Sequence, residues 1–408
     1  MSIENFKFCQ ALEGIVGASN VSGTMRLHGV EMAAVCTPET EPQAAEIIRF
    51  AASNKIAVVP YGSGTGQCIG YPPPRDSLVL STRKLATLIQ HEPADMVATA
   101  QAGMQLADFQ SALATRGQWL PLDGPPNATL GGLAATDRSG ACAHGYGTLR
   151  DMVLGMKVIN GDGVLRKCGG KVVKNVTGYA MEKLYIGSLG TLGLITEITF
   201  KLRPLPGNRD GWHIAVMDLR HGVESMRKIA ALNLPLEMIQ LLSTQAAAAL
   251  FTRLEVSAPL HLLVSAAGTA VELDRIDGEI NAVASASRFQ WRTLDFLYVQ
   301  PDTEGQALVR FWCVPSRLGQ TLELLLSGLS ENGAWLTGIT GGACVLRLAP
   351  ARTKELTEGL TRLGVNFRFD DAQGFSIEAP FGPPRPEAAL MKRIKTALDP
   401  QGILNPGR

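Results

Sequence analysis

A strand-like apolar run passes directly into a glycine-rich loop in IAVVPYGSGTG, residues 56–66. Glycine lets backbone N–H groups approach a ligand closely and adopt positive φ angles, so such a loop can hold a diphosphate without cations. The loop differs from the Rossmann pattern, because Gln67 stands where the third glycine is required and a strand, SLVLS at 77–81, follows where a helix should begin. A Walker loop also fails, since Lys171 is followed by Val172. The pattern therefore disfavours ordinary NAD and ATP sites.

The residues around this loop have the periodicity of alternating strands and helices. A strand at 31–36 is followed by Thr40 and Gln43 in capping-box spacing, which predicts a helix through residue 54. After about Pro206 the composition changes to longer amphipathic helices, which indicates a second domain. Between these regions the sequence predicts strands at 85–93 and 96–103, a helix at 106–115 that ends at Gly117, and a hairpin of 152–159 and 164–168 around Asn-Gly-Asp-Gly.

Two further glycine-rich stretches lie at 129–140 and 187–193. Each could be a place where two strands cross closely, and for each loop taken alone this stays an alternative. Three separated loops of this kind in one domain are harder to explain as turns. Together they indicate an extended cofactor.

The composition describes a large globular α/β protein, with 46% apolar and 18% charged residues among 408. With 38 basic and 37 acidic residues, the chain lacks the positive field of a nucleic-acid-binding protein, so we expect no such partner. Its seven widely spaced cysteines include no Cys-x-x-Cys pair, which argues against an iron–sulfur or zinc site built from this chain alone. We expect no metal site.

No stretch of the sequence approaches the roughly 20 apolar residues of a membrane-spanning helix. The beginning, MSIENFKFCQ, also lacks a basic segment followed by an apolar one, which a secretion signal requires. We therefore expect a cytoplasmic protein with reduced thiols.

The motifs together resemble a flavoprotein family. The segments that carry the resemblance are VVPYGSGTG, ATLGGLAATDRSG, GYGTLRDMVLGMKVINGDG, GGKVVKNVTGY, IGSLGTLGLITEITFKLRPLP and ALDPQGILNPGR. They are similar to the FAD-binding subunit of glycolate oxidase, within the wider group of vanillyl-alcohol-oxidase and p-cresol-methylhydroxylase (PCMH) flavoproteins. The resemblance is dense over residues 30–207, resumes at 386–408, and is thin between them.

The resemblance implies an α+β fold in four parts. Residues 1–26 would be an N-terminal helical segment, and residues 27–207 a PCMH-type FAD-binding domain of two α/β subdomains. Residues 208–385 would form an α+β cap domain for substrate or for a subunit interface. Residues 386–408 would be a C-terminal helix and tail that returns to the FAD domain.

The resemblance also implies that FAD binds to the glycine-rich stretches and the tail. Its diphosphate would lie on the backbone of Gly62, Ser63, Gly64, Thr65 and Gly66. The ribityl chain and ring would lie against Thr129, Leu130, Gly131, Gly132, Thr136, Ser139 and Gly140, the adenine end near Gly193 and Ile195, with Asn405 folding back toward the flavin. Relatives with covalently bound flavin have a histidine in the first loop, which this chain lacks, so we expect non-covalent FAD. Attachment through His144 is the less favoured alternative.

Oxidation of a 2-hydroxy acid requires a base for the hydroxyl proton and a cation for the carboxylate. The last 147 residues contain no histidine, although relatives that oxidise D-lactate or glycolate unaided carry a histidine-rich motif in this part. The base therefore stays unassigned. For the carboxylate, candidates on apolar strands are Arg310, Arg347 and Arg368, although strand alternation equally predicts that each faces solvent. The adjacent Asp370 and Asp371 could serve as base or ligand, but such a pair is more typical of a solvated turn.

The missing histidine motif and cysteine clusters agree with a division of labour that the resemblance implies. The chain would be the FAD-binding subunit of a multi-subunit glycolate oxidase (glycolate dehydrogenase). Its partners would be a second flavoprotein subunit with the catalytic histidines and an iron–sulfur subunit, in contact with the inner face of the cytoplasmic membrane only through the complex. The alternatives are a self-contained FAD-dependent 2-hydroxy-acid dehydrogenase and a non-catalytic flavin-binding scaffold. Apolar helices in 222–252 and 319–330 are candidates for a subunit interface or for ordinary core packing.

Overall fold

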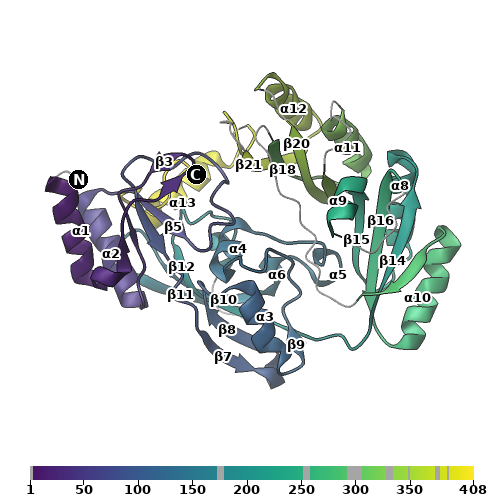
Figure 1. Ribbon diagram of the computed structural model, residues 1–408, viewed down its shortest axis with the longest axis horizontal. Helices are drawn as coiled ribbons and strands as arrows, with labels where there is room; N and C mark the ends of the chain where they lie inside the picture. Colours follow the sequence, from purple (N-terminus) through teal and green to yellow (C-terminus); the bar gives the residue numbers. More distant parts are fainter. Residues whose placement is uncertain are drawn as a thin grey trace. The chain divides into compact units, whose positions relative to one another are not determined.

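The computed structural model describes residues 3–171, 179–250, 258–291, 306–327, 334–347, 350–372, 377–383 and 386–408. The chain forms two compact units (Figure 1). Unit 1 consists of Met1–Ser139, Thr148–Leu205 and Pro384–Arg408, and unit 2 of Gly140–Gly147 and Pro206–Pro383.

The first sheet of unit 1 carries the glycine loop at 62–66. It has the order β1-β4-β6-β5, in which β4 (Ala34–Cys36), β6 (Leu78–Ser81) and β5 (Val58–Tyr61) are parallel and β1 (Val21–Ser22) is antiparallel. The helix α2 (Glu41–Asn54) follows β4 and, together with α1 (Ile3–Val16), buries an apolar core against this sheet. The predicted capping box at the start of α2 is confirmed, since the backbone N–H of Gln43 donates to Thr40 Oγ1 at 3.3 Å.

The second sheet of unit 1 is antiparallel, with the order β11-β10-β12-β8-β7. These strands are β11 (Leu165–Gly169), β10 (Val153–Ile159), β12 (Leu194–Lys201), β8 (Val97–Gln101) and β7 (Leu88–Glu92). The predicted hairpin is confirmed, because β10 and β11 pair from Ile159 opposite Leu165 across the turn. Helix α3 (Leu106–Ala114) places Phe109 against Phe200 of β12, with ring centroids 5.6 Å apart.

Short elements complete unit 1. They are the 3₁₀ turns η1 (Ala18–Asn20) and η2 (Pro93–Asp95), the pairs β2 (Arg26–Leu27) with β3 (Val30–Glu31) and β9 (Gln118–Trp119) with β13 (Arg203–Pro204), and the helices α4 (Leu130–Thr136), α6 (Leu149–Met152), α7 (Glu182–Tyr185) and α13 (Ala388–Leu398).

Unit 2 is built on one antiparallel sheet with the order β17-β14-β16-β15-β19-β20-β18-β21. In chain order its strands are β14 (Arg209–Val216), β15 (Leu236–Ser243), β16 (Leu260–Ala267), β17 (Ser287–Gln290), β18 (Gln306–Trp312), β19 (Trp335–Gly338), β20 (Gly341–Arg347) and β21 (Asn366–Ala372). Its sequence-distant strands meet in the middle, where β15 pairs with β19.

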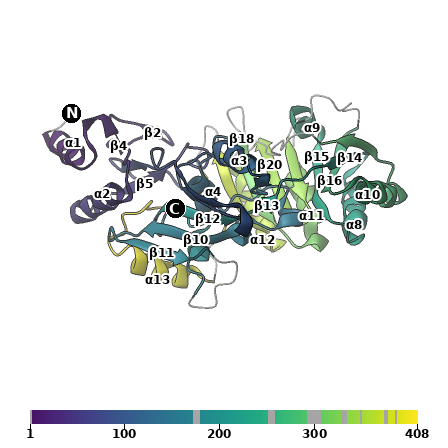
Figure 2. The same cartoon turned by 90° about the horizontal axis from the view of Figure 1, so that it is seen from below.

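Helices lie on both faces of this sheet (Figure 2). The larger core contains side chains of α8 (Leu219–Ala231), α10 (Ala270–Val283), α11 (Leu318–Leu326) and α12 (Pro350–Arg362). The other face is covered in part by α9 (Thr244–Leu250) and by the segment that contains α5 (Ala143–Tyr146); the 3₁₀ turn η3 (Pro315–Arg317) precedes α11. Core packing therefore accounts for the apolar faces of α8 and α11, and residues 251–252 and 328–330 of the predicted helices lie outside the described residues.

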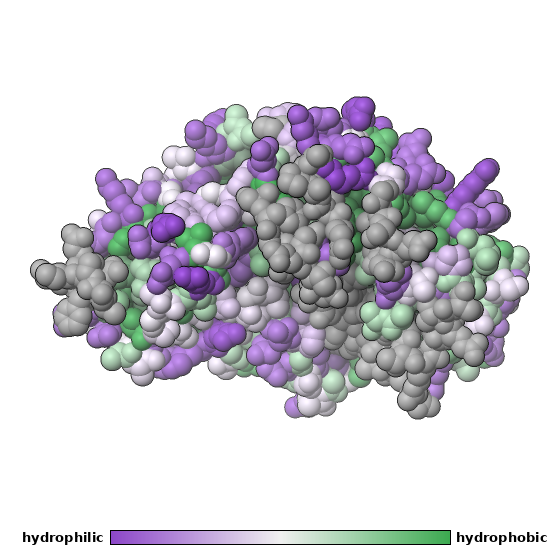
Figure 3. All heavy atoms as spheres, turned by 45° about the horizontal axis from the view of Figure 1, so that its top comes forward, coloured by the Kyte–Doolittle hydropathy of each residue, from purple (hydrophilic) through white to green (hydrophobic). Residues whose placement is uncertain are grey.

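Within the described ranges, no helix combines the length and apolarity needed to cross a membrane. On the face drawn in Figure 3, hydrophilic residues are spread over the described surface, with hydrophobic residues in smaller areas between them.

Candidate functional site

A pocket in unit 1 brings together the three glycine-rich stretches and the C-terminal tail. The loop after β5, the segment at the start of α4, the loop before β12 and the tail after α13 each contribute to its wall. The residues that the sequence predicts for the site and that line this pocket are Gly62, Ser63, Gly64, Thr65, Gly66, Thr129, Gly131, Gly132, Thr136, Gly193, Ile195 and Asn405. Segments separated by more than 300 residues in sequence thus surround one space.

The first two stretches touch where glycine has no side chain. A Cβ atom on Gly62 would lie 2.1 Å from Thr129 Oγ1, and one on Gly66 would lie 2.8 Å from Thr136 Cγ2. Gly64 has a φ of +88°, which side chains rarely adopt. Each of these glycines is therefore required by the local backbone or by the neighbouring stretch.

The second stretch is fixed by the start of α4. Thr129 is the N-cap residue, and its Oγ1 accepts a hydrogen bond from the backbone N–H of Gly132 at 3.2 Å. A Cβ on Gly131 would lie 2.8 Å from the Cβ of Ala102, which follows β8. The side chain of Leu130 is fully buried and does not line the pocket. The stretch is thus held against the second sheet, with Thr129 and Thr136 at the pocket.

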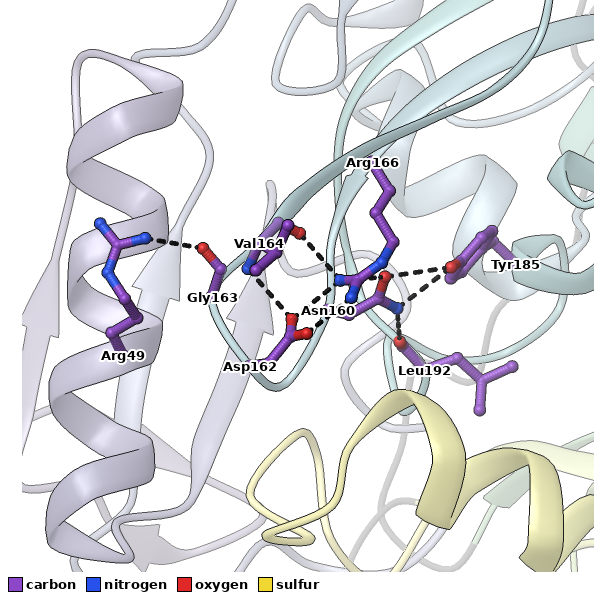
Figure 4. Close-up of polar contacts among 8 residues, drawn as sticks. All are labelled: Arg49, Asn160, Asp162, Gly163, Val164, Arg166, Tyr185 and Leu192. Carbon is purple, nitrogen blue, oxygen red and sulfur yellow. Dashed lines mark hydrogen bonds and ion pairs between the residues drawn. The ribbon is translucent and has the colours of Figure 1, made fainter.

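The third stretch is held by a polar network centred on Asn160 (Figure 4). The side-chain amide of Asn160 donates to the carbonyl oxygen of Leu192 at 2.6 Å and to the hydroxyl of Tyr185 at 3.0 Å. Arg166 donates to Asn160 Oδ1 at 3.2 Å and pairs with Asp162 at 2.6 Å. The Asn-Gly-Asp-Gly turn of the β10–β11 hairpin therefore fixes the backbone next to Gly193.

The tail is anchored by an ion pair whose carboxylate, that of Asp399, is buried. Lys395 of α13 contacts Asp399 at 2.5 Å and also donates to the carbonyl oxygens of Thr191, at 2.6 Å, and Leu404, at 2.7 Å. Asn405 then donates from Nδ2 to the carbonyl oxygen of Leu189 at 2.6 Å. The same helix thus positions the third stretch and the tail residue that faces the pocket.

Two buried polar atoms of the pocket residues have no hydrogen-bond partner among the described residues. They are Ser63 Oγ and Asn405 Oδ1. Leaving such a group unpaired costs about 1–3 kcal/mol, so an unpaired atom at a pocket marks a place for a ligand group. A polar ligand that runs from the first loop to the tail would pair with both atoms. The glycines leave the space for it that Cβ atoms would otherwise fill. The residues present therefore fit a flavin dinucleotide.

Some predicted residues do not line the pocket. Leu130 is buried elsewhere in unit 1, and the hydroxyl of Ser139 accepts a hydrogen bond from the backbone N–H of Leu149 at 2.9 Å. Gly140 and His144 belong to unit 2, where α5 contacts β15. Their proposed roles stay predictions.

Sequence reasoning missed several residues of the pocket wall. These are Pro60, Tyr61, Gln67, Thr82, Ala135, Leu189, Gly190, Leu194 and Arg408. Most lie beside a predicted residue in sequence. Arg408 had its own signal, since it stands three positions after Asn405 in a tail that was expected to return to this domain.

The arginine candidates of unit 2 meet at one buried carboxylate. Arg310 of β18 and Arg368 of β21 are direct cross-strand neighbours, and both form ion pairs with Asp370. Asp370 is only 3% exposed, so the predicted solvated turn is wrong. The reason is that Asp370 lies at an irregularity of the β18–β21 ladder that turns it toward both guanidinium groups. Arg347 ends β20, and its side chain lies outside the described part of the chain.

The chain has six histidines, all at described positions, and none lines the pocket. In unit 2, His213 and His261 are hydrogen-bonded to each other at 2.8 Å, and His261 is fully buried. Burial lowers the pKa of both imidazoles. Within unit 1, the pocket residues therefore offer no imidazole as a base.

Comparison with protein-family models finds two matches. The model described as FAD binding domain matches residues 32–169, and the model described as FAD linked oxidases, C-terminal domain, matches residues 384–408. The solved structure of p-cresol methylhydroxylase with substrate bound has a TM-score of 0.75 to this chain at 17% identity, covering 100% of this chain and 97% of that one. Both predicted features, a PCMH-type FAD-binding fold and a tail of the same family, are confirmed.

Among curated proteins, three relatives differ in how much they share. The probable mitochondrial D-lactate dehydrogenase of Danio rerio is 26% identical over 92% of this chain and 83% of its own length. Glycolate oxidase subunit GlcE of Escherichia coli is 35% identical over 40% of this chain and 46% of its own, and subunit GlcD of Bacillus subtilis is 33% identical over 42% and 37%. The matches to the two glycolate oxidase subunits thus span less than half of those proteins.

Proposed function

Because the chain has the FAD-binding fold of the PCMH-type oxidases, we propose that it is an FAD-dependent oxidoreductase of 2-hydroxy acids and works as the FAD-binding subunit of a glycolate-oxidase-type complex. The observation that carries this proposal is the pocket of unit 1, where three glycine-rich stretches and Asn405 surround one space. The names of the relatives, which include D-lactate dehydrogenase and glycolate oxidase subunits, support the substrate class.

FAD, when bound, accepts the two electrons of the alcohol. The chain's own residues therefore serve to bind and orient the cofactor and the substrate. The loop at 62–66 offers backbone N–H groups to the diphosphate, and Thr129 and Thr136 face the pocket from α4. Ser63 Oγ and Asn405 Oδ1 offer the two unpaired polar atoms to the cofactor. We propose non-covalent binding, because the first loop has no histidine to which a flavin could attach.

For the substrate carboxylate we propose the pair of Arg310 and Arg368. Both guanidinium groups form ion pairs with the carboxylate of Asp370, so two cationic side chains lie together on a mostly buried part of the sheet. Arginine forms bidentate hydrogen bonds with carboxylates, so such a cluster can recognise a 2-hydroxy acid. Arg310→Lys keeps the charge and loses the bidentate geometry, and we expect the KM for a 2-hydroxy acid to rise about tenfold or more.

The complex is proposed because the pocket offers no histidine as a base. Abstraction of the hydroxyl proton needs a group whose pKa lies near the operating pH, most often histidine. None of the six histidines lines the pocket. We therefore propose that a second flavoprotein subunit supplies the catalytic histidines and that an iron–sulfur subunit accepts the electrons. Any membrane contact would then be made through this complex, on its cytoplasmic side.

A self-contained 2-hydroxy-acid dehydrogenase is the second candidate. It is favoured by the extent of the match to the D-lactate dehydrogenase of Danio rerio, which covers 92% of this chain, compared with 40% for GlcE of E. coli. A dehydrogenase of this kind would need an aspartate or a tyrosine as its base in place of histidine.

The test is to purify the chain alone, record its flavin spectrum, and add glycolate or D-lactate without oxygen. We expect that the flavin stays oxidised with either substrate until the partner subunits are added. We also expect acid denaturation to release the flavin into solution, because it is bound non-covalently. Bleaching by substrate with the chain alone would replace the subunit proposal with the self-contained dehydrogenase. Absence of flavin after FAD has been added would overturn both proposals and favour a scaffold role.

A further inference from the structure

Arg408 is the only charged residue among the described residues that line the pocket. Its guanidinium lies at the end of the first glycine loop, where Nη2 donates to the carbonyl oxygen of Gln67 at 2.7 Å and Nε to that of Tyr71 at 3.3 Å. Nη1 is 3.4 Å from the side-chain oxygen of Gln67. These partners are neutral.

A short hairpin contacts the same guanidinium nitrogen through His28. His28 and Gly29 have positive φ angles of 51° and 74° and form the turn between β2 and β3. This turn brings His28 Nε2 to 3.2 Å from Arg408 Nη2 and to 2.6 Å from the carbonyl oxygen of Gln67. The side chain of Arg408 is therefore fixed by two segments that precede and follow the strand β5 in sequence.

In the described part of the chain, no aspartate or glutamate side chain forms an ion pair with Arg408, and none lines the pocket. Burial lowers the pKa of the guanidinium from 12.5 to about 10, so the group is still cationic at neutral pH. A mostly buried cation without a counter-ion is costly, because desolvation disfavours the charged form. An anionic ligand group in the pocket would remove this cost.

We propose that Arg408 is the cationic clamp of the FAD diphosphate and that the tip of the β2–β3 hairpin, through His28, keeps its guanidinium directed at that group. The inference rests on the proposed FAD-binding function and adds a charged residue to the binding site. The glycine loop at 62–66 contributes uncharged N–H donors, whereas the diphosphate is negatively charged at both phosphoryl groups. A guanidinium at the end of the same loop provides charge-assisted hydrogen bonds that the amides cannot.

The alternative is that Arg408 only fastens the tail to the loop. The two roles differ in their dependence on phosphate. If Arg408 is a clamp, its removal weakens the binding of ligands that carry a diphosphate. The affinity for riboflavin, which has no diphosphate, then stays unchanged. A tail fastener affects both ligands alike, because it acts through the shape of the pocket.

The experiment compares the affinities of FAD, ADP and riboflavin for the full chain, stripped of flavin, by isothermal titration. For Arg408→Met we expect FAD and ADP to bind about 10- to 100-fold more weakly, with riboflavin within twofold of the unchanged chain. Arg408→Lys keeps the charge and should recover part of the loss. Lys392→Met, on the exposed face of α13, is the matched control and should bind all three ligands normally.

The salt dependence gives a second measurement. FAD affinity of the unchanged chain should fall as ionic strength rises, and this fall should be smaller for Arg408→Met. Equal losses for riboflavin and ADP, or a lower unfolding temperature of the flavin-free variant with unchanged salt dependence, would overturn the clamp. Failure of the unchanged chain to bind FAD would instead contradict the proposed function, whereas normal FAD binding by Arg408→Met would contradict this inference alone.

Discussion

At the scale of single residues, Gly62 and Thr129 bring the first two glycine-rich stretches into contact. A Cβ on Gly62 would lie 2.1 Å from Thr129 Oγ1, and real Cβ atoms essentially never come this close to another heavy atom. The threonine cannot simply rotate away, because its hydroxyl caps α4 through the N–H of Gly132. The absence of a side chain at residue 62 is therefore what lets the two stretches share one pocket.

We predict that Gly62→Ala weakens FAD binding at least about tenfold, because overpacking of a closely fitted site costs about 1–3 kcal/mol. Gly14→Ala is the matched control, since a Cβ at that position of α1 meets nothing within 4 Å. Quenching of flavin fluorescence in a titration gives both affinities. Combining Gly62→Ala with Thr129→Ala removes the clashing oxygen and should restore part of the affinity, and equal binding by Gly62→Ala and the unchanged chain would refute the argument.

Residues that meet only in three dimensions were the ones that sequence reasoning could not assign. The glycines were predicted because each stretch carries its own local signal. Asp370 was misjudged, since one of its two arginine partners, Arg310, is 60 positions away in sequence. Arg408 was missed although it stands three positions after Asn405, because its contact with Gln67 is visible only in the structure.

At the scale of elements, α13 fixes the tail and the third stretch through one ammonium group. Lys395 is bound to Asp399 and to two carbonyl oxygens, and Asp399 also accepts hydrogen bonds from the backbone N–H groups of Ile403 and Leu404. We predict that Lys395→Met lowers the free energy of unfolding by about 3–5 kcal/mol, because it leaves a buried carboxylate without its cation.

Urea denaturation of the flavin-free chain measures this effect of Lys395→Met. Lys392→Met on the exposed face of the same helix should change the free energy of unfolding by less than about 0.5 kcal/mol. FAD affinity should fall together with stability, since Asn405 and Leu189 depend on the same anchor. A variant with normal stability would show that the backbone N–H groups alone satisfy Asp399.

The β18–β21 pair depends in a similar way on Asp370. Arg310 and Arg368 lie directly opposite each other, so without the carboxylate two like charges would face one another in a mostly buried place. We predict that Asp370→Asn lowers the free energy of unfolding of unit 2 by about 3–5 kcal/mol. Glu323→Gln, an exposed position on α11, is the control, and tryptophan fluorescence in urea measures both. An unchanged transition for Asp370→Asn would mean that the arginines are neutralised by other groups.

Most elements of unit 1 could be predicted because their signals are local. The capping box of α2 and the β10–β11 hairpin each involve residues that are close in sequence. The order of the eight strands in unit 2 could not be predicted, since β15 pairs with β19 nearly one hundred residues later and no local pattern specifies that partner.

At the scale of the whole molecule, the two units have separate apolar cores and different spectroscopic reporters. The core of unit 2 contains Trp212 and Trp335, and four of the five tryptophans lie within Pro206–Pro383, at positions 212, 291, 312 and 335. Tryptophan fluorescence therefore follows mainly unit 2, while flavin binding follows the pocket of unit 1. The two signals allow acid effects on the units to be separated.

We predict that acid destabilises unit 2 through the His213–His261 pair. Burial lowers the pKa of both imidazoles below the ordinary value of 6.5, and the charge of His261 further lowers that of His213. The unfolded chain therefore binds more protons than the folded one once the pH falls below 6.5, so stability is present above this pH and is lost as the pH falls toward the folded pKa values. Urea unfolding followed by tryptophan fluorescence, repeated from about pH 7 to about pH 5, should show this fall. The slope of the free energy of unfolding against pH should become shallower in the double variant His213→Gln, His261→Gln. It should keep its value in the control His91→Gln of unit 1. An identical slope in the unchanged chain and both variants would rule out the pair as its source.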